Sequence, residues 1–223
     1  QSAVNWDASL EYYFEPVGSL SVSWFRKRIR DYIITGTNVG TVPSGNDNGF
    51  NGEYSGFTLL SSSNAGTATV NGWEFAYQQQ FTFLPGLLKG LGASLNYTLL
   101  EASGNFGGTT NRETNQVPGF IPRTANATVS WRYRKFSTRV LYNHVGSYIT
   151  SYNATSPGYS AYRFAYRTVN LGVTWQLRPS LQLTADVGNL FNEPQRTYRG
   201  FTDRMSGTII NGTSLTFGVN GRF

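Results

Sequence analysis

Aromatic and arginine side chains are the residues of this sequence whose chemistry suits a ligand, and that chemistry is binding. An aromatic ring in a polar loop can stack on a sugar or another flat ring, although packing within the loop is the simpler reason for its presence. An arginine on the polar face of a strand can line a ligand path, although any wetted surface also needs such residues. The candidates for substrate contact are Phe50, Tyr54, Phe57, Phe106, Tyr152, Tyr159, Arg132 and Arg139.

A second candidate site is the basic run that contains Arg26, Lys27, Arg28 and Arg30. Guanidinium and ammonium groups bind phosphates and other anions through charge-assisted hydrogen bonds. An anionic small molecule and the phosphates of a lipid are both ligands of this kind, and the position of the run at the end of a strand favours the lipid. The net charge of +6 also raises nucleic acid as a partner. Because the other basic residues are scattered and form no recognised motif, we expect no nucleic-acid partner.

The sequence offers no set of residues for catalysis or for metal binding. Cys is absent and His144 is the single histidine, so no cluster has the spacing of a metal site. We find no Ser-His-Asp arrangement, phosphate-binding loop or paired carboxylate set. We therefore expect no catalytic residues, no metal and no cofactor, and a protein that is not an enzyme.

The composition indicates a surface that faces lipid. Charged residues make up 13% of the 223 residues and aromatic residues 15%. A soluble protein of this kind would risk aggregation through its apolar surface. No run approaches the roughly 18 to 20 apolar residues that a membrane helix needs. Membrane β-strands with aromatic girdles at the two interfaces would remove this risk, because their apolar surface faces lipid. We expect His144 to belong to such a girdle.

The elements that must position the candidates are strands in which apolar and polar residues alternate. The last stretch, 213–223, has Leu215, Phe217, Val219 and Phe223 on one face and polar residues on the other. Such period-two alternation indicates a strand with one apolar face. The pattern slips between residues 26 and 34, where a bulge or an exit from the membrane layer would explain it. Strands are predicted at 3–14, 19–34, 67–83, 91–99, 125–133, 136–148, 169–177, 181–191 and 213–223.

The connections between these strands alternate in length. Short turns are predicted at 15–18, 84–90, 134–135 and 178–180, and long polar loops at 35–66, 103–119, 151–161 and 192–211. Outer-membrane barrels have short periplasmic turns and long extracellular loops. The pattern therefore predicts an all-β fold, an antiparallel up-and-down transmembrane β-barrel, with about nine strands present. The last strand should pair with the strand at 181–191.

Three motifs and the chain end resemble the C-terminal barrel of TonB-dependent outer-membrane receptors. They are the strand at 18–33 with its basic, aromatic end, the Gly72-x-Glu74 strand that closes in Leu84-Pro85-Gly86, and the Asn189-Leu190-Phe191 segment. The terminal Phe223 is similar to the signal that the barrel assembly machinery reads. The resemblance implies the outer membrane of a Gram-negative bacterium and a barrel of about 22 strands.

The resemblance also implies partners and a transport function. A full-length relative would bind a scarce nutrient, such as a siderophore-iron complex, cobalamin or a glycan, and receive energy from TonB. We expect the chain to be the C-terminal part of such a receptor, without its plug domain and N-terminal strands. Its other expected partners are membrane lipid, lipopolysaccharide and the missing N-terminal part of the barrel. A structural or adhesive barrel component of a larger surface assembly is the alternative.

Overall fold

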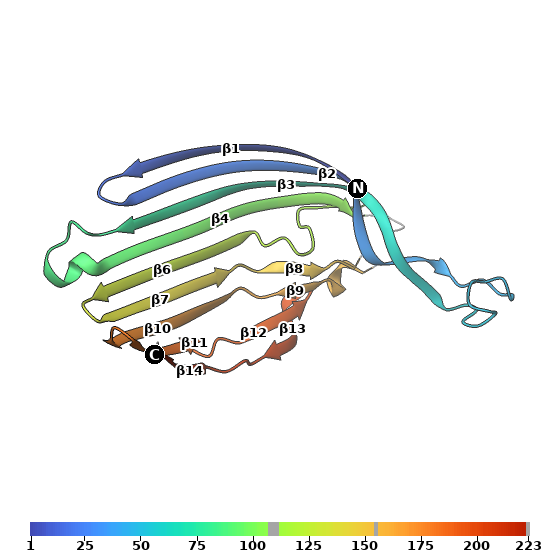
Figure 1. Cartoon of the computed structure of the whole chain (residues 1–223). Helices are drawn as coiled ribbons and strands as arrows, with labels where there is room; N and C mark the ends of the chain where they lie inside the picture. The colour runs from blue at the N-terminus through green and yellow to red at the C-terminus, as the bar shows by residue number, and fades with distance from the viewer. Residues whose placement is uncertain (107–111, 154–155, 222–223) are drawn as a thin grey trace.

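The computed structural model describes residues 1–106, 112–153 and 156–221. One antiparallel sheet dominates it, in the order β1-β2-β3-β4-β6-β7-β10-β11-β14 (Figure 1). The strands are β1 (Ser2–Phe14), β2 (Gly18–Thr41), β3 (Thr58–Gln80), β4 (Leu91–Phe106), β6 (Arg123–Tyr133), β7 (Phe136–Val145), β10 (Tyr166–Arg178), β11 (Leu181–Gly188) and β14 (Ser214–Gly221). The short β5 (Arg112–Thr114) pairs with the end of β4. The predicted all-β fold with nine main strands is confirmed.

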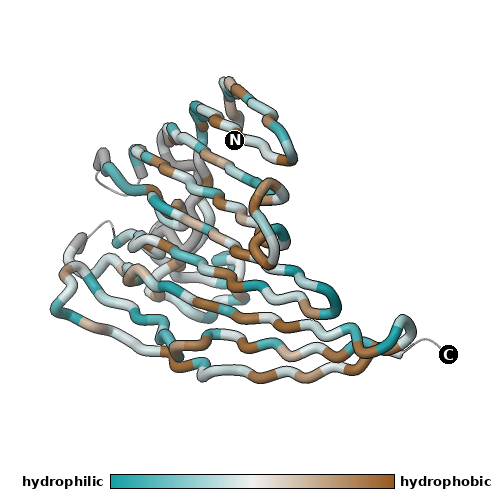
Figure 2. Tube along the Cα trace, turned by 90° about the vertical axis from the view of Figure 1, so that its left-hand side faces the viewer, coloured by the Kyte–Doolittle hydropathy of each residue, from teal (hydrophilic) through white to brown (hydrophobic). Residues whose placement is uncertain are grey.

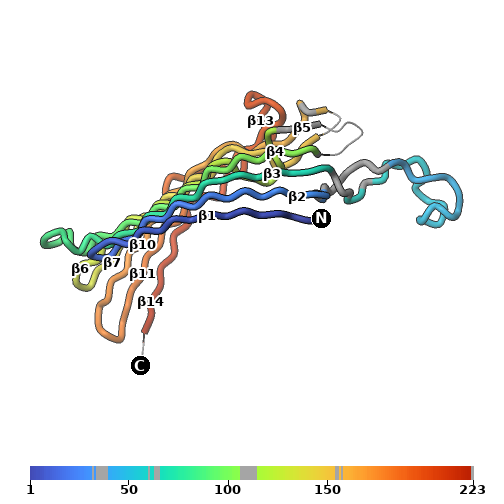
Figure 3. The backbone as a smooth tube through the Cα atoms, turned by 90° about the horizontal axis from the view of Figure 1, so that it is seen from above, coloured from blue at the N-terminus to red at the C-terminus, as the bar shows by residue number. Residues whose placement is uncertain are grey.

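The sheet is curved but not closed. Seen from above, β11 and β14 turn away from the direction of β1 and β2 (Figure 3). In the described residues β1 pairs only with β2, and β14 pairs only with β11. The predicted pairing of the last strand with the strand that begins at Leu181 is confirmed. No helix in the described ranges is long and apolar enough to cross a membrane.

Short connections lie at one end of the main sheet and long ones at the other (Figure 1). The turn at 15–17 joins β1 to β2, residues 134–135 join β6 to β7, and 179–180 join β10 to β11. The connection from β3 to β4 contains a short 3-10 helix, η1 (Gly86–Gly90). The predicted segregation of short turns from long connections is therefore confirmed.

Over most of the main sheet, strands have one mainly apolar and one mainly polar side, and the register carries this pattern across five strands. One row runs through Tyr133, Phe136, Trp175, Leu183 and Val219. The next row runs through Arg132, Ser137, Thr174, Thr184 and Gly218. Directly opposed residues share a face, so we call the first face the outward face and the second the lumen face. Figure 2 shows the same alternation of hydropathy along the chain.

The outward face carries large apolar side chains without cover from this chain. Trp175 is 38% exposed and Phe217 is 77% exposed, and the rings of Phe136 and Trp175 stack with 5.5 Å between centroids. An apolar surface of this extent requires an apolar solvent. The outward face is therefore the lipid-facing face of a membrane sheet.

A small hydrophobic cluster lies on the lumen face at the middle of β2 and β3 and near the end of β4. Ile29, Ala68, Val70 and Ala102 are buried there under Val117, which belongs to the 115–122 segment. This segment hydrogen-bonds on both sides, because Leu100 N donates to Pro122 O and Gly119 N donates to Ile149 O. It continues the wall beyond the point where β4 leaves β6.

A second, four-stranded sheet is built from the long connections, in the order β13-β12-β9-β8. Its strands are β8 (Tyr148–Ser151), β9 (Ala161–Arg163), β12 (Gln195–Arg199) and β13 (Phe201–Ile209), and η2 (Pro157–Tyr159) lies before β9. The predicted loops at 151–161 and 192–211 were therefore wrong in part, since both contain paired strands. The predicted strand at 136–148 was also too long, because β7 ends at Val145 and Tyr148 begins β8.

The first long loop was also predicted too long. β2 continues to Thr41 and β3 begins at Thr58, so residues 42–57 alone form the loop of a hairpin that reaches past its neighbours (Figures 1 and 3). The second predicted loop, 103–119, likewise contains the end of β4 and all of β5.

Of the two alternatives for the slip within 26–34, a bulge or an exit from the membrane layer, the register contradicts the bulge. The pairing of β2 with β3 keeps one register through Ile34 and shifts only beyond it, between Ile34 and Thr37 and again between Asn38 and Gly40. The pattern changes because Arg26, Arg28 and Arg30 occupy the outward face, while Ile29 faces the lumen cluster. The other alternative, an exit of the strand from the membrane layer, stays a prediction.

Candidate functional site

The candidates for substrate contact fall in three separate places. Phe50, Tyr54 and Phe57 lie in the hairpin loop between β2 and β3, and Tyr152 and Tyr159 lie beside the second sheet. The two arginines, Arg132 and Arg139, lie on the lumen face of the main sheet. The side chain of Phe106 lies outside the described part of the structure, and so does Phe223.

The hairpin loop is organised by one amide side chain. Asn48 Nδ2 donates to Glu53 O at 2.8 Å and to Pro43 O at 3.2 Å. Its Oδ1 accepts from Phe50 N at 2.8 Å and from Gly52 N at 3.0 Å. All four bonds satisfy backbone groups that a loop would otherwise leave to water. The loop therefore has a defined conformation at its tip.

The three loop aromatics form a chain of edge-to-face contacts. The centroids of Phe50 and Tyr54 are 5.9 Å apart, and those of Tyr54 and Phe57 are 6.0 Å apart, at interplanar angles of 83° and 89°. All three rings remain exposed. The contacts show packing between loop side chains, and the exposed ring surfaces leave the predicted stacking on a ligand sterically open.

The second sheet presents a compact aromatic cluster, which we define as Tyr162, Phe164, Tyr198 and Arg196. Tyr162 and Tyr198 are directly opposed on β9 and β12, and their rings stack with 5.0 Å between centroids at 9°. The ring centroids of Phe164 and Tyr198 are 4.5 Å apart, and Cζ of Arg196 lies 5.4 Å from the centroid of the Phe164 ring. Stacked rings with a guanidinium over one face bind flat or anionic ligands well.

Burial raises the pKa of the Tyr162 phenol, and the nearby phenols of Tyr198 and Tyr152 raise it further. All three effects favour the protonated form. Tyr152 also packs against the hydrophobic cluster of the main sheet. It therefore connects the aromatic cluster with the wall of the lumen.

Tyr159, in η2, is held by Arg204 of β13. The Arg204 guanidinium lies 5.0 Å from the centre of the Tyr159 ring, and Arg204 Nη1 donates to Gly158 O at 3.3 Å. Tyr159 nevertheless remains more than half exposed. It offers an aromatic face at a fixed place.

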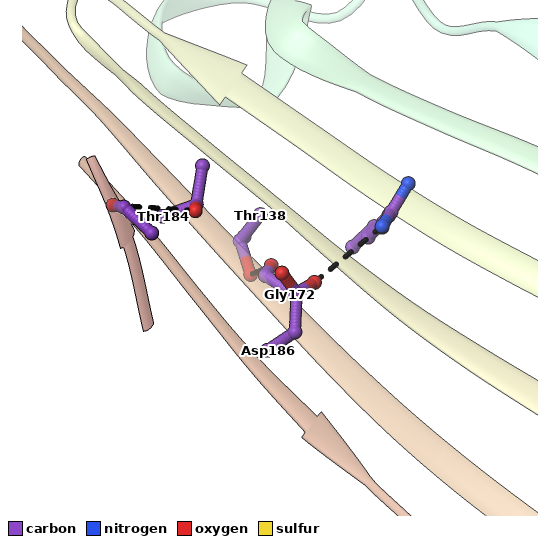
Figure 4. Close-up of polar contacts among 6 residues, drawn as sticks. Thr138, Gly172, Thr184 and Asp186 are labelled. Carbon is purple, nitrogen blue, oxygen red and sulfur yellow. Dashed lines mark hydrogen bonds and ion pairs between the residues drawn. The ribbon is translucent and has the colours of Figure 1, made fainter. Parts of the chain in front are cut away.

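On the lumen face, Arg139 of β7 reaches across β10 to Asp186 of β11 (Figure 4). Arg139 Nη2 and Asp186 Oδ1 are 3.4 Å apart. Gly172 lies between them, and a Cβ at this position would approach Asp186 Oδ1 to 2.8 Å and Arg139 Nε to 2.9 Å. Arg132 lies near the short-turn end of β6, so it is remote from the long connections.

The basic run is divided between the two faces of β2. Arg26, Arg28 and Arg30 are opposite Trp6, Val4 and Ser2 and lie on the outward face. Lys27 is opposite Asn5 and Val70, which places it on the lumen face. The structure therefore brings the three arginines together and separates Lys27 from them.

His144 lies on the outward face, opposite Ala125 and Arg167. Its Nδ1 is buried and has no hydrogen-bond partner in the described part of the chain. Among the described residues no group of three or more His, Cys, Asp or Glu side chains could hold a metal ion. His144 lies near the outer ends of β6 and β7, and its role in an aromatic girdle stays a prediction.

The residues that the sequence analysis missed are those of the aromatic cluster. Tyr162 and Phe164 are two positions apart, as are Arg196 and Tyr198. This spacing is that of a strand and would have placed each pair on one face. The sequence does not single out these pairs, because each strand is short and lies within a stretch with the composition of a polar loop.

The fold defines the class of protein. A curved antiparallel sheet with a lipid-facing side, a wetted side and long connections at one end is the wall of an outer-membrane β-barrel. The family model described as TonB dependent receptor-like, beta-barrel matches residues 1–190. The chain belongs to this family and to the outer membrane of a Gram-negative bacterium.

Comparison with solved structures agrees with the family assignment. The ferric yersiniabactin uptake receptor FyuA from Yersinia pestis superimposes with a TM-score of 0.67 at 18% identity, covering 99% of this chain and 30% of that one. The ferric enterobactin receptor PfeA from Pseudomonas aeruginosa gives a TM-score of 0.65 at 19% identity, covering 99% and 31%. The chain thus spans less than a third of these proteins, and the likeness concerns the fold. No curated protein sequence matched the chain.

Proposed function

We propose that the chain forms barrel wall and outer connections of an active transporter that takes up a scarce nutrient. The observation that carries the proposal is the family match over residues 1–190. The wetted lumen face and the aromatic cluster supply what an uptake path needs, namely a polar wall and a place to bind a ligand. No observation favours the structural or adhesive alternative.

The chemistry of the outer connections supports the nutrient classes that we propose. The aromatic cluster, Tyr159 and the hairpin aromatics offer π-faces, and Arg196 and Arg204 add positive charge beside two of them. Ferric siderophores, cobalamin and glycans present rings or anionic groups that such surfaces bind. Arg139 and Arg132 of the lumen face would contact the nutrient only later on its path.

The rest of the transporter would come from chain beyond these residues. We propose that further strands pair with the free edges of β1 and β14 and close a barrel of about 22 strands. A lipid-exposed sheet edge is not tolerated in a membrane, because its backbone groups have no partner there. A plug domain and the segment that contacts TonB would belong to the same additional part. Phe223 would serve the barrel assembly machinery as its signal, and the protein would perform no catalysis.

The proposal is tested with the full-length protein and with a strain that lacks it. Purified receptor is titrated with a panel of ferric siderophores, cobalamin and glycans, and uptake of the ligand that binds is compared in tonB-positive and tonB-negative cells. Saturable binding of one class together with TonB-dependent uptake is the expected result. Binding of none of the panel, with uptake that does not depend on TonB, would instead favour a structural or adhesive role.

A further inference from the structure

Three arginines of β2 form a row on the outward face of the sheet. Alternate residues of a strand share a face and are about 6.8 Å apart, so Arg26, Arg28 and Arg30 present three guanidinium groups along one line. All three side chains are exposed. The residues between them lie on the other face, where Ile29 is buried in the hydrophobic cluster and Lys27 faces the lumen.

An apolar floor adjoins this row. Val4, Trp6 and Trp24 line one groove of about 440 Å³ together with the three arginines. Tryptophan on a lipid-facing surface marks the level at which acyl chains give way to headgroups. Because β2 runs from a short turn toward the long hairpin, the arginines lie on the outer side of Trp24. They are therefore at headgroup level in the outer leaflet.

The positive charge of the row is not neutralised within the described residues. The residues directly opposite the arginines on β1 and β3 are uncharged, namely Ser2, Val4, Trp6, Thr67, Thr69 and Asn71. The ion pair that the described residues do form, between Arg139 and Asp186, lies on the other face of the sheet, the lumen face. Like charges at this spacing repel one another, and a bound polyanion removes that cost.

We propose that Arg26, Arg28 and Arg30 bind the phosphate groups of an outer-leaflet glycolipid of the lipopolysaccharide type, with its acyl chains against Trp6 and Trp24. A free inorganic anion would use the arginines but would gain nothing from the two indole rings. A neutral lipid would use the rings but leave the arginines unpaired. A phosphorylated lipid would contact both the arginines, through its phosphates, and the indole rings, through its acyl chains. This inference concerns the outward face and does not depend on the proposed transport function.

The test uses the full-length protein, stripped of lipid in detergent and titrated by native mass spectrometry. The probes are bisphosphorylated lipid A, lipid A without its phosphates, and inorganic phosphate. The variant is R26Q/R28Q/R30Q, and K27Q is its matched control, because Lys27 lies in the same segment but on the other face. Heat-dependent mobility in gels establishes that each variant forms a folded barrel.

Bisphosphorylated lipid A should bind the wild type and K27Q alike, and the triple variant should lose about tenfold or more in affinity. The unphosphorylated lipid and inorganic phosphate should bind weakly to all three proteins. Equal affinity of wild type and triple variant, an equal loss in K27Q, or equal binding of the unphosphorylated lipid would overturn the proposal. Arginine-dependent binding of inorganic phosphate as tight as that of lipid A would overturn the lipid assignment. Should the triple variant fail to fold, R28Q alone must weaken lipid A binding, and an unchanged affinity would count against the site.

Discussion

Arg139 and Asp186 form an ion pair across an entire intervening strand, with 3.4 Å between Nη2 and Oδ1. The strand between them, β10, contributes Gly172 at the crossing point, directly opposite both residues. The absence of a side chain at Gly172 leaves the space through which the pair forms (Figure 4). The contact thereby links β7 directly with β11, in addition to the backbone ladders that join each of them to β10.

The ion pair should contribute little to stability. The two side chains are 62% and 48% exposed, and exposed pairs are screened by water. A double-mutant cycle with R139Q and D186N in the full-length protein should give a coupling energy of about 0.2–1 kcal/mol. Urea unfolding in lipid vesicles measures it. A coupling energy of several kcal/mol would mean that the pair is far better shielded than its exposure indicates.

Gly172→Ala should abolish this coupling at a small cost in stability. The added Cβ would displace the ends of two flexible side chains and no backbone atom, so we expect a loss below about 1 kcal/mol. The same double-mutant cycle, repeated in the Gly172→Ala background, should give a coupling energy near zero. Gly158→Ala is the control, since a Cβ there would meet open space. A coupling energy that persists in the Gly172→Ala background would contradict the assigned role of Gly172.

Neighbouring positions on β10 should respond in opposite ways to a charge. Val173 lies on the outward face and Thr174 on the lumen face. Val173→Arg places a charge in lipid and should lower the free energy of unfolding by up to about 2–4 kcal/mol near the membrane midplane. Thr174→Arg places the charge on the lumen face and should lower it much less. Unfolding of both full-length variants in vesicles compares them directly. Equal costs would invalidate the assignment of the two faces.

Asn48→Ala should loosen the hairpin loop at 42–57. The substitution removes both bonds that Nδ2 donates and both that Oδ1 accepts, and leaves their backbone partners to water. Amide hydrogen exchange across the loop should accelerate, while exchange in β10 stays unchanged. Asp47→Ala is the adjacent control on the same exposed tip. If Asp47→Ala accelerates exchange as much, the Asn48 bonds are not what orders the loop.

We expect the aromatic ring of Tyr198 to contribute to the affinity for the nutrient. Tyr198→Ala removes the stacking partner of Tyr162 and the neighbour of Phe164, and should weaken ligand binding about tenfold. Tyr198→Phe keeps the ring and should bind as the wild type does. Phe201→Ala, at an exposed position of β13, is the control for a general effect on the second sheet. Titration of each full-length variant with the identified ligand gives the affinities.

The sequence alone determined the features that arise from local alternation of apolar and polar residues. The alternation of apolar and polar residues follows from strand geometry, so it predicted most of the main strands and which residues of each share a face. The lengths of the connections then predicted which ends of the strands lie together. Leu215, Phe217 and Val219 were assigned correctly to one face of the last strand for this reason.

Only the tertiary structure decided which distant segments pair. Tyr162 stacks on Tyr198, and Arg139 reaches Asp186 over a separation of 47 residues, through contacts that no local pattern records. Alternation along β2 is enough to separate Lys27 from Arg26, Arg28 and Arg30, but only the pairing placed the arginines opposite Trp6, Val4 and Ser2 and Lys27 opposite Asn5 and Val70. Sequence alternation specifies the faces of a strand, whereas pairing between strands determines what each face meets.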